Sequence, residues 1–410
     1  MIQVEFQTEK ISEDLREQAQ RGFDDLMQRA DLGFHQLASR YDLWQRSAEV
    51  GRNLRSRFRH LGVLGIGGSS LGVRALIQAL DPGDWQDKIS VFDNVDPVHF
   101  NRRLNQLADV LSECHWVIIS KSGNTIETLC AADFILQLLR EKGIDPSGHF
   151  TVVTEEKSSP LWDWAQQNGH PVLPVPIDVG GRFSVLTPVG LLPAAFLGLD
   201  IEAMRQGAEW ARAQADLTVE LVAQSLKNFA LEKWITLFWS YTDLLHTSCF
   251  WYQQLWSESL GKALDRRGQP APRASSPFAC LGASDQHSIL QQVMEGARDK
   301  FVWFFRCRAV EKAGDRLEKT AFARQELLVG RGMGELLAAE ADATREAFTQ
   351  QKIPSLTLVV EQLSERELAA LFMLLELVVG AVGEAMNINA FDQPGVELGK
   401  RLARAKLASQ

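Results

Sequence analysis

Two loops rich in glycine and hydroxyl side chains carry the strongest chemical signal in the sequence. The first reads Gly65-Ile66-Gly67-Gly68-Ser69-Ser70-Leu71-Gly72, between a predicted strand and a predicted helix. Glycines there let the backbone approach an anion, and the start of the helix offers unpaired N–H groups. Ser70 stands at the third glycine of G-x-G-x-x-G and no P-loop lysine follows, so neither nucleotide motif is met. A phosphate cradle and a plain tight turn both remain open.

The second loop reads Ile119-Ser120-Lys121-Ser122-Gly123-Asn124-Thr125-Ile126-Glu127-Thr128. Its hydroxyl and amide groups could surround one anion, and Lys121 could add charge. Asn124 and Glu127 alone resemble a capping box, but that alternative leaves the clustered hydroxyl groups unexplained. Because both loops follow strands of one predicted parallel sheet, they fit a ligand at a switch-point crevice. The ligand would be a phosphate monoester.

Arg182 and Glu258, further along the chain, are residue types suited to charge stabilisation and general-base chemistry. Arg182, in Gly180-Gly181-Arg182-Phe183-Ser184, is a permanent cation beside flexible backbone. Glu258 follows a group of aromatic residues, and such surroundings desolvate a carboxylate, which suits a general base. The ordinary alternatives are a surface arginine after a turn and a solvated helix glutamate.

Two further residues could exchange protons. His287, in Ser284-Asp285-Gln286-His287-Ser288, follows a predicted strand and titrates near neutrality. Lys400 ends the motif that begins Phe391-Asp392-Gln393-Pro394-Gly395 and could donate a proton to a ring oxygen. A capping or core histidine and a solvated helix lysine are the common alternatives.

Composition limits the classes of protein that this chain could be. Its 410 residues indicate two to three domains, and its net charge of −9 argues against nucleic-acid or anionic-membrane binding. The five cysteines include no C-x-x-C pair, which disfavours a disulfide framework or a thiolate zinc cluster. No signal peptide is visible, and the apolar stretch from Leu368 to Val382 contains Glu376, so we expect a buried helix rather than a membrane span. These features favour the cytoplasm.

Alternating strands and helices must position the candidate residues. The first fifty residues have helical spacing, and apolar runs then predict strands at 61–66, 89–92, 116–120 and 150–154. Such alternation implies βαβ units and a parallel sheet. Prolines 171, 174 and 176 should interrupt any sheet and mark a boundary. A helical region at about 200–265 precedes three more predicted strands, at 278–281, 301–307 and 356–360, and helices at 364–385 and from about 396.

Taken in order, these motifs and Asn94-Val95-Asp96-Pro97 resemble the short bacterial form of the phosphoglucose isomerase family, from about residue 60 to 403. The resemblance implies an α/β fold with two αβα sandwich sugar-isomerase (SIS) domains, parallel-rich sheets, and N-terminal and C-terminal helices. We expect an N-terminal helical segment at 1–55, a smaller phosphate-binding SIS domain at 56–190, a second SIS domain at 191–385 and a C-terminal helical arm at 386–410.

The resemblance also implies roles. Glu258 would be the proton-shuttling base and Arg182 would stabilise an enediolate, while His287 and Lys400 would assist ring opening. Substrate-binding roles fall to Gly68, Ser69, Ser120, Lys121, Ser122, Thr125, Gln254 and Gln393. The family works as a homodimer on a small sugar phosphate without metal or organic cofactor, and His287 resembles the histidine that the family supplies from the neighbouring subunit.

Some positions depart from the family. Asn124 stands where short forms usually have threonine, Ser70 where longer forms have aspartate, and the basic stretch 265–277 has no clear counterpart. Other interpretations are a dual phosphoglucose/phosphomannose isomerase, a non-catalytic SIS sensor of sugar phosphates, and a nicotinamide dehydrogenase. A sensor has no reason to keep Glu258, His287, Arg182 and Lys400 together, and the failed dinucleotide motif weakens the dehydrogenase.

Overall fold

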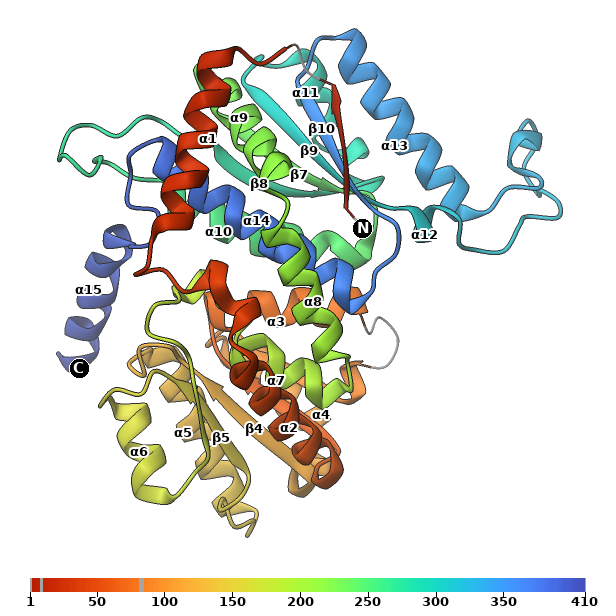
Figure 1. Cartoon of the computed structure of the whole chain (residues 1–410). Coiled ribbons are helices and arrows are strands. Elements are labelled where there is room, and N and C mark those ends of the chain that lie inside the picture. Colours follow the sequence, from red (N-terminus) through yellow and green to blue (C-terminus); the bar gives the residue numbers. More distant parts are fainter. Residues whose placement is uncertain (1, 8–9, 81–84, 410) are drawn as a thin grey trace.

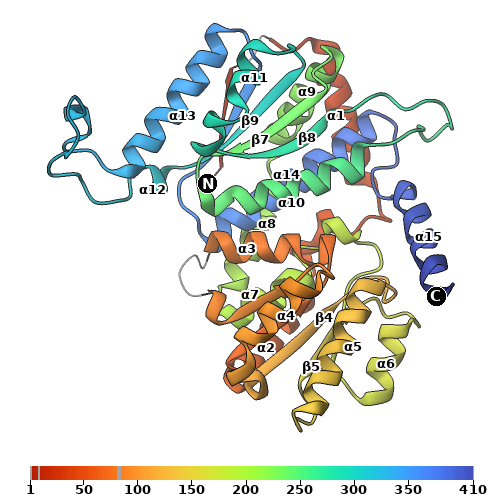
Figure 2. The ribbon, with the colours of Figure 1, turned by 180° about the vertical axis from the view of Figure 1, so that it is seen from behind.

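The computed structural model describes residues 2–7, 10–80 and 85–409 and contains two five-stranded sheets, each covered by helices on both faces. The sheets form two bodies, one above the other in Figures 1 and 2. The prediction of an α/β fold with two αβα sandwiches is confirmed.

The first sheet is wholly parallel and contains, in spatial order, β3 (Ile89–Phe92), β2 (His60–Leu64), β4 (Cys114–Ile119), β5 (Phe150–Thr154) and β6 (Val172–Pro174). One face packs on α2 (Tyr41–Arg57), α3 (Leu71–Leu80) and α7 (Pro188–Leu197). The other packs on α4 (Pro97–Gln106), α5 (Ile126–Glu141) and α6 (Pro160–Asn168). Strands buried on both faces are continuous apolar runs, which is why the sequence predicts them well.

The second sheet has the order β1 (Gln3–Gln7), β10 (Ser355–Val360), β9 (Lys300–Cys307), β7 (Ile235–Ser240) and β8 (Ser276–Leu281). Only β1 is antiparallel to its neighbour, β10. One face packs on α1 (Glu13–Gln28), α9 (Ala215–Ala230), α10 (Asp243–Leu260) and α14 (Glu365–Ala385). The other packs on α11 (Leu290–Glu295) and α13 (Met333–Gln350).

The remaining helices connect these layers. They are α8 (Ile201–Arg212), which packs against α14, the short α12 (Arg308–Glu311), and α15 (Glu397–Ala408), which projects to one side of the molecule in both views (Figures 1 and 2). The two bodies meet where α3 packs against α10. This contact places the loop after β2 next to the helix that carries Glu258.

Helix α14 is long and apolar enough to cross a membrane, but 94 % of its most apolar window is buried inside the protein. It is a core helix, as the sequence predicts. Glu376 lies in its middle with 0 % exposure, and neither carboxylate oxygen has a hydrogen-bond partner among the described residues. Burial raises the pKa of Glu376 well above 4.5.

Three strands differ from the sequence predictions. Strand β1 lies in the segment expected to be helical, and β7 lies within the predicted helical region 200–265. Strand β6 contains Pro174, although prolines were expected to interrupt the sheet there. Pro174 is tolerated because β6 is an edge strand. The N–H group that proline lacks is not needed on the side of β6 that has no neighbouring strand.

Candidate active site

The two sequence loops lie side by side at the carboxyl edge of the first sheet. One follows β2 and the other follows β4, and these strands pair directly. In the second loop, the hydroxyl groups of Ser120 and Thr125 hydrogen-bond at 2.9 Å, so they face the same volume. Asn124 turns back on Ser122 through two hydrogen bonds. The helix therefore begins at an N-cap of Thr125, and the capping box considered for Asn124 does not form.

Lys121 points to a carboxylate at the end of the neighbouring strand. Its Nζ lies 2.9 Å from Oε1 of Glu155. The ion pair is only partly exposed, since the two side chains keep 27 % and 16 % of their accessible surface. The lysine charge expected for the phosphate pocket is thus largely matched by a carboxylate within the protein.

The first glycine loop touches the arginine loop directly. A Cβ at Gly68 would clash with the carbonyl oxygen of Gly181 and would lie 2.9 Å from the amide nitrogen of Arg182. Gly67 has a φ of +62°, and a Cβ there would approach Nε2 of Gln254 to 3.0 Å. These glycines allow two backbones and the α10 side chain to meet, while Ser69 lies beside them in the short 3₁₀ turn Gly67–Ser69.

Arg182 is the centre of the site. Its Nε donates to the hydroxyl of Ser259 at 2.7 Å, and its Nη1 donates to Glu258 at 3.3 Å and to Gln393 at 3.0 Å. Its Nη2 donates to the carbonyl oxygens of Ala390 and Asp392. A guanidinium has five N–H donors, and five acceptors surround this one. Burial lowers the pKa of Arg182, and the Glu258 and Asp392 carboxylates oppose that shift.

Glu258 lies in the last turn of α10, between Arg182 and Gln254. Gln254 donates from Nε2 to Oε1 of Glu258 at 2.8 Å, one helical turn away. The carboxylate side chain remains 32 % exposed. The aromatic residues that precede Glu258 in the sequence do not surround its carboxylate as expected, because Trp251, Tyr252 and Trp256 are buried in the core. Glu258 instead faces polar partners.

Lys400 and His287 are not joined to this network. Lys400 lies on α15 with its side chain 58 % exposed, and its Nζ pairs with Glu397 at 2.9 Å. His287 is exposed in the 3₁₀ turn Ser284–His287 after β8. No contact in the described part of the chain links either residue to Glu258 or Arg182. Helix α15 has no buried residue, and Arg404 donates from it to the carbonyl oxygen of Asn124 at 2.8 Å.

Comparison with known proteins identifies the family of the chain. The family model described as "Phosphoglucose isomerase" matches residues 44–410. The chain belongs to the phosphoglucose isomerase family. A probable glucose-6-phosphate isomerase of Haloarcula marismortui is 37 % identical, covering 85 % of this chain and 78 % of the relative. The glucose-6-phosphate isomerase of Carboxydothermus hydrogenoformans is 34 % identical, covering 88 % and 82 %.

Solved structures show the same fold. A hypothetical protein from Thermus thermophilus superposes with a TM-score of 0.89 at 30 % identity, over 100 % of both chains. A glucose-6-phosphate isomerase from Chlamydia trachomatis superposes with a TM-score of 0.85 at 23 % identity, covering 99 % of this chain and 88 % of the other.

Several residues of this phosphoglucose isomerase family member escaped the sequence analysis. Ser259 and Lys262 lie in the motif around Glu258, and Asp392 lies beside Gln393, but none was assigned a role. Glu155, the partner of Lys121, was also missed. The only signal for Lys262 is its spacing of four residues after Glu258, which places a cation near the end of the same helix.

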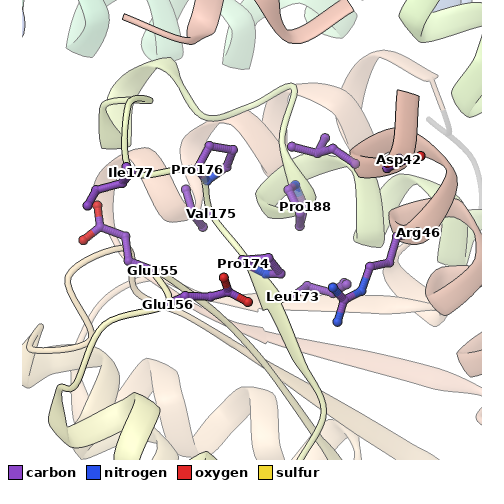
Figure 3. A pocket seen from close by; sticks show the side chains of 11 residues that line it. Asp42, Arg46, Glu155, Glu156, Leu173, Pro174, Val175, Pro176, Ile177 and Pro188 are labelled. Atoms are coloured by element: carbon purple, nitrogen blue, oxygen red, sulfur yellow. The ribbon is translucent and has the colours of Figure 1, made fainter. Parts of the chain in front are cut away.

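Two pockets lie near the family's motif loops. A pocket of about 380 Å³ between α3 and α10 includes Gln254 and Ser257 in its lining. A pocket of about 480 Å³ lies beside β6, with Arg46 on one side and Glu155 and Glu156 on the other (Figure 3). None of the candidate site residues is among the described residues that line this second pocket. Among residues 2–7, 10–80 and 85–409, no three His, Cys, Asp or Glu side chains gather as a metal site.

Proposed function

We propose that this chain interconverts glucose 6-phosphate and fructose 6-phosphate as an aldose–ketose isomerase. The family membership supports the reaction. The observation that carries it is the carboxylate of Glu258, held at 3.3 Å by Arg182 and at 2.8 Å by Gln254. A fixed carboxylate beside a buried cation is what proton abstraction next to a carbonyl requires.

Substrate binding begins with the phosphate. We assign it to the loop of residues 120–125, with Ser69 contributing from the neighbouring loop. The start of α5 adds free N–H groups and the positive end of a helix dipole. Because the phosphate lies away from the reacting carbons, its binding energy is converted into positioning of C1 and C2 against Glu258.

The chemical step moves one proton between adjacent carbons. Glu258 removes the proton from C2 of the open aldehyde, and the C–H electron pair forms the enediolate C=C bond while negative charge moves to oxygen. The same carboxyl group returns the proton to C1 while the hydroxyl proton passes from the C2 oxygen to the C1 oxygen, which yields the ketose. No net oxidation occurs, because C2 is oxidised as C1 is reduced.

Arg182 can follow the negative charge through this step. In the resting site, all five of its donors have protein acceptors, and Glu258 is one of them. When Glu258 takes up the proton it becomes neutral and binds the guanidinium less tightly. The Nη1 hydrogen then becomes available to the enediolate oxygen as the charge arises there. We infer that Arg182 exchanges one anion for another.

We assign ring opening to His287 and Lys400, as the family resemblance implies. Both side chains are exposed in the isolated chain. A second subunit that brings its His287 to the open side of the site would complete it, so we propose a homodimer as the active form. We also propose that the enzyme works in the cytoplasm on a small sugar phosphate.

A coupled assay of fructose 6-phosphate conversion tests the proposal, with mannose 6-phosphate as the comparator substrate. We expect turnover of fructose 6-phosphate to glucose 6-phosphate. Equal turnover of mannose 6-phosphate would identify a dual isomerase. Binding of fructose 6-phosphate by folded protein without any turnover would contradict the proposal and indicate a sensor.

A further inference from the structure

Lys262 is a nearly buried lysine next to the base, with no role in the reaction outlined above. It follows the end of α10, and its side chain is only 7 % exposed. Its Nζ donates to the carbonyl oxygen of Glu258 at 2.9 Å, to Oδ1 of Asp392 at 3.0 Å, and to the carbonyl oxygen of Asp392. An ammonium group has three N–H donors, so all of them have an acceptor within the protein.

The partners of Lys262 belong to the two segments that build the site. Glu258 lies on α10, and Asp392 lies in the turn before Gln393. The Asp392 carbonyl oxygen also accepts from Nη2 of Arg182 at 3.0 Å, so two cations converge on one oxygen. Asn389 holds the other side of this turn, since its Nδ2 donates to Oδ2 of Asp392 at 2.8 Å.

We propose that Lys262 is a positioning residue that fixes the carboxylate of Glu258 relative to Arg182 by joining the end of α10 to the turn at Asp392. The inference rests on the proposed isomerase function. Lys262 acts through Glu258 and Arg182: its ammonium group holds the carbonyl oxygen of Glu258 and the Asp392 carbonyl oxygen that Arg182 also binds. Charge-assisted hydrogen bonds of this kind are short and directional, which suits them to holding two segments in register.

Loss of the Lys262 ammonium group should loosen the contact between the end of α10 and the turn at Asp392. Without the ammonium, the carbonyl oxygens of Glu258 and Asp392 lose a donor, and Asp392 is left with its hydrogen bonds from Arg182 and Asn389. The base and the guanidinium then lose their common anchor. A displacement of about 1 Å between reacting groups can cost roughly 10²-fold in rate. The phosphate loop lies on the other body and keeps its own hydrogen bonds.

The test compares two full-length variants, Lys262→Met and Lys300→Met. Steady-state kinetics are measured for both. Lys300 is a matched control because it is also buried, at 3 % exposure, and pairs with Asp299 at the start of β9, the central strand of the second sheet. We expect Lys262→Met to lower kcat at least tenfold while KM changes less than about threefold. Lys300→Met should lower the melting temperature and leave kcat per folded chain unchanged.

An unchanged kcat in folded Lys262→Met overturns the inference, and so does a rise in KM alone. If Lys262→Met does not fold, Lys262→Gln removes the charge but keeps a neutral NH2 donor group, and it serves under the same criteria, with circular dichroism to verify folding. A wild-type chain without isomerase activity would overturn the proposed function and this inference with it. An active wild type with an equally active Lys262 variant would overturn the inference alone.

Discussion

The loop at 120–125 and the network around Arg182 are built in opposite ways. In the loop, Ser120 bonds to Thr125 and Asn124 to Ser122, all within six consecutive residues. In the network, Arg182 bonds to Ser259 and Gln393, which lie 77 and 211 residues away along the chain. The hydrogen bonds of Ser120 and Asn124 can form once the loop's own strand and helix form. The network exists only when both bodies and the segment after α14 have come together.

This difference separates binding from chemistry. We propose that this loop binds the phosphate group, and the hydrogen bonds that shape it lie within the loop itself. A carboxylate and a guanidinium that must act on one carbon need distant segments in fixed register. Substitutions in the loop should therefore change KM, and substitutions in the network should change kcat.

The largest effect is expected from Glu258→Gln in the network. It keeps the side-chain shape but removes the proton acceptor, and one of the two oxygens that accept from Arg182 and Gln254 becomes an NH2 donor. General-base removal costs about 10²–10⁴-fold in rate, so kcat should fall by that factor with KM nearly unchanged. Glu295→Gln, an exposed glutamate on α11, is the matched control. Turnover near the wild-type rate would remove Glu258 from the mechanism.

The loop should give the complementary result. Ser120→Ala and Thr125→Ala each remove a hydroxyl group that we assign to the phosphate. A hydrogen bond to a charged group contributes roughly 1.5–3 kcal/mol, so KM for fructose 6-phosphate should rise about tenfold or more for each change. Ser147→Ala, on an exposed turn, is the control. If KM and inhibition by inorganic phosphate both stay at wild-type values, the loop has only a structural role.

The second body also contains the buried Glu376, which should make the stability of the protein depend on pH. With its pKa raised in the fold, the unfolded chain ionises first as pH rises above 4.5. Stability from this group is thus greatest below that value and falls with rising pH, by about 1.4 kcal/mol for each pH unit until the folded pKa is reached. Glu376→Gln should remove this dependence.

Thermal unfolding of both proteins between pH 5 and pH 8 measures the effect. The melting temperature of the Gln variant relative to the wild type should increase steadily with pH. A difference that stays constant across this range would mean that Glu376 is ionised in the fold or does not titrate there.

His287 belongs to neither region within one chain, and subunit mixing tests where it acts. In a heterodimer of His287→Ala and Glu258→Gln, one site combines both defects and the other contains two intact residues. Random mixing should restore up to about one quarter of wild-type activity, because two-fold symmetry repeats the site twice. Verified mixing without recovery would place His287 in its own chain's site or outside the reaction.

The sequence predicts the buried strands of this fold well and the exceptional ones poorly. Strands β2, β4 and β9 are apolar runs that need no information from elsewhere. Strand β7 is equally apolar, but it lies between two long helices, and its short run is hard to distinguish from a helix segment. Strand β1 has only five residues, too few for alternation to be clear, and only pairing with β10 stabilises it.

Some parts of the candidate site can likewise be predicted from the sequence, and others cannot. The loop at 120–125 is visible in the sequence because its donors are consecutive. The family resemblance supplied Arg182 and Glu258, but not the hydrogen bond from Arg182 to Ser259 or the contact between Lys262 and Asp392. Those contacts depend on the packing of α10 against the segment after α14, which no local pattern encodes. The pairing of Lys121 with Glu155 likewise depends on the register of two strands.

Strand β1 also sets an order of events during synthesis. It precedes every other described strand in the chain, yet its partner β10 is the last strand to be made. At typical translation rates of about 5–20 residues per second, the ribosome needs roughly 20–70 s to pass from one to the other. All strands of the first sheet emerge in that interval, so the first body can fold while β1 is still unpaired. The second sheet is completed only when β1 pairs with β10. This pairing covers an edge of β10 that could otherwise pair with another chain.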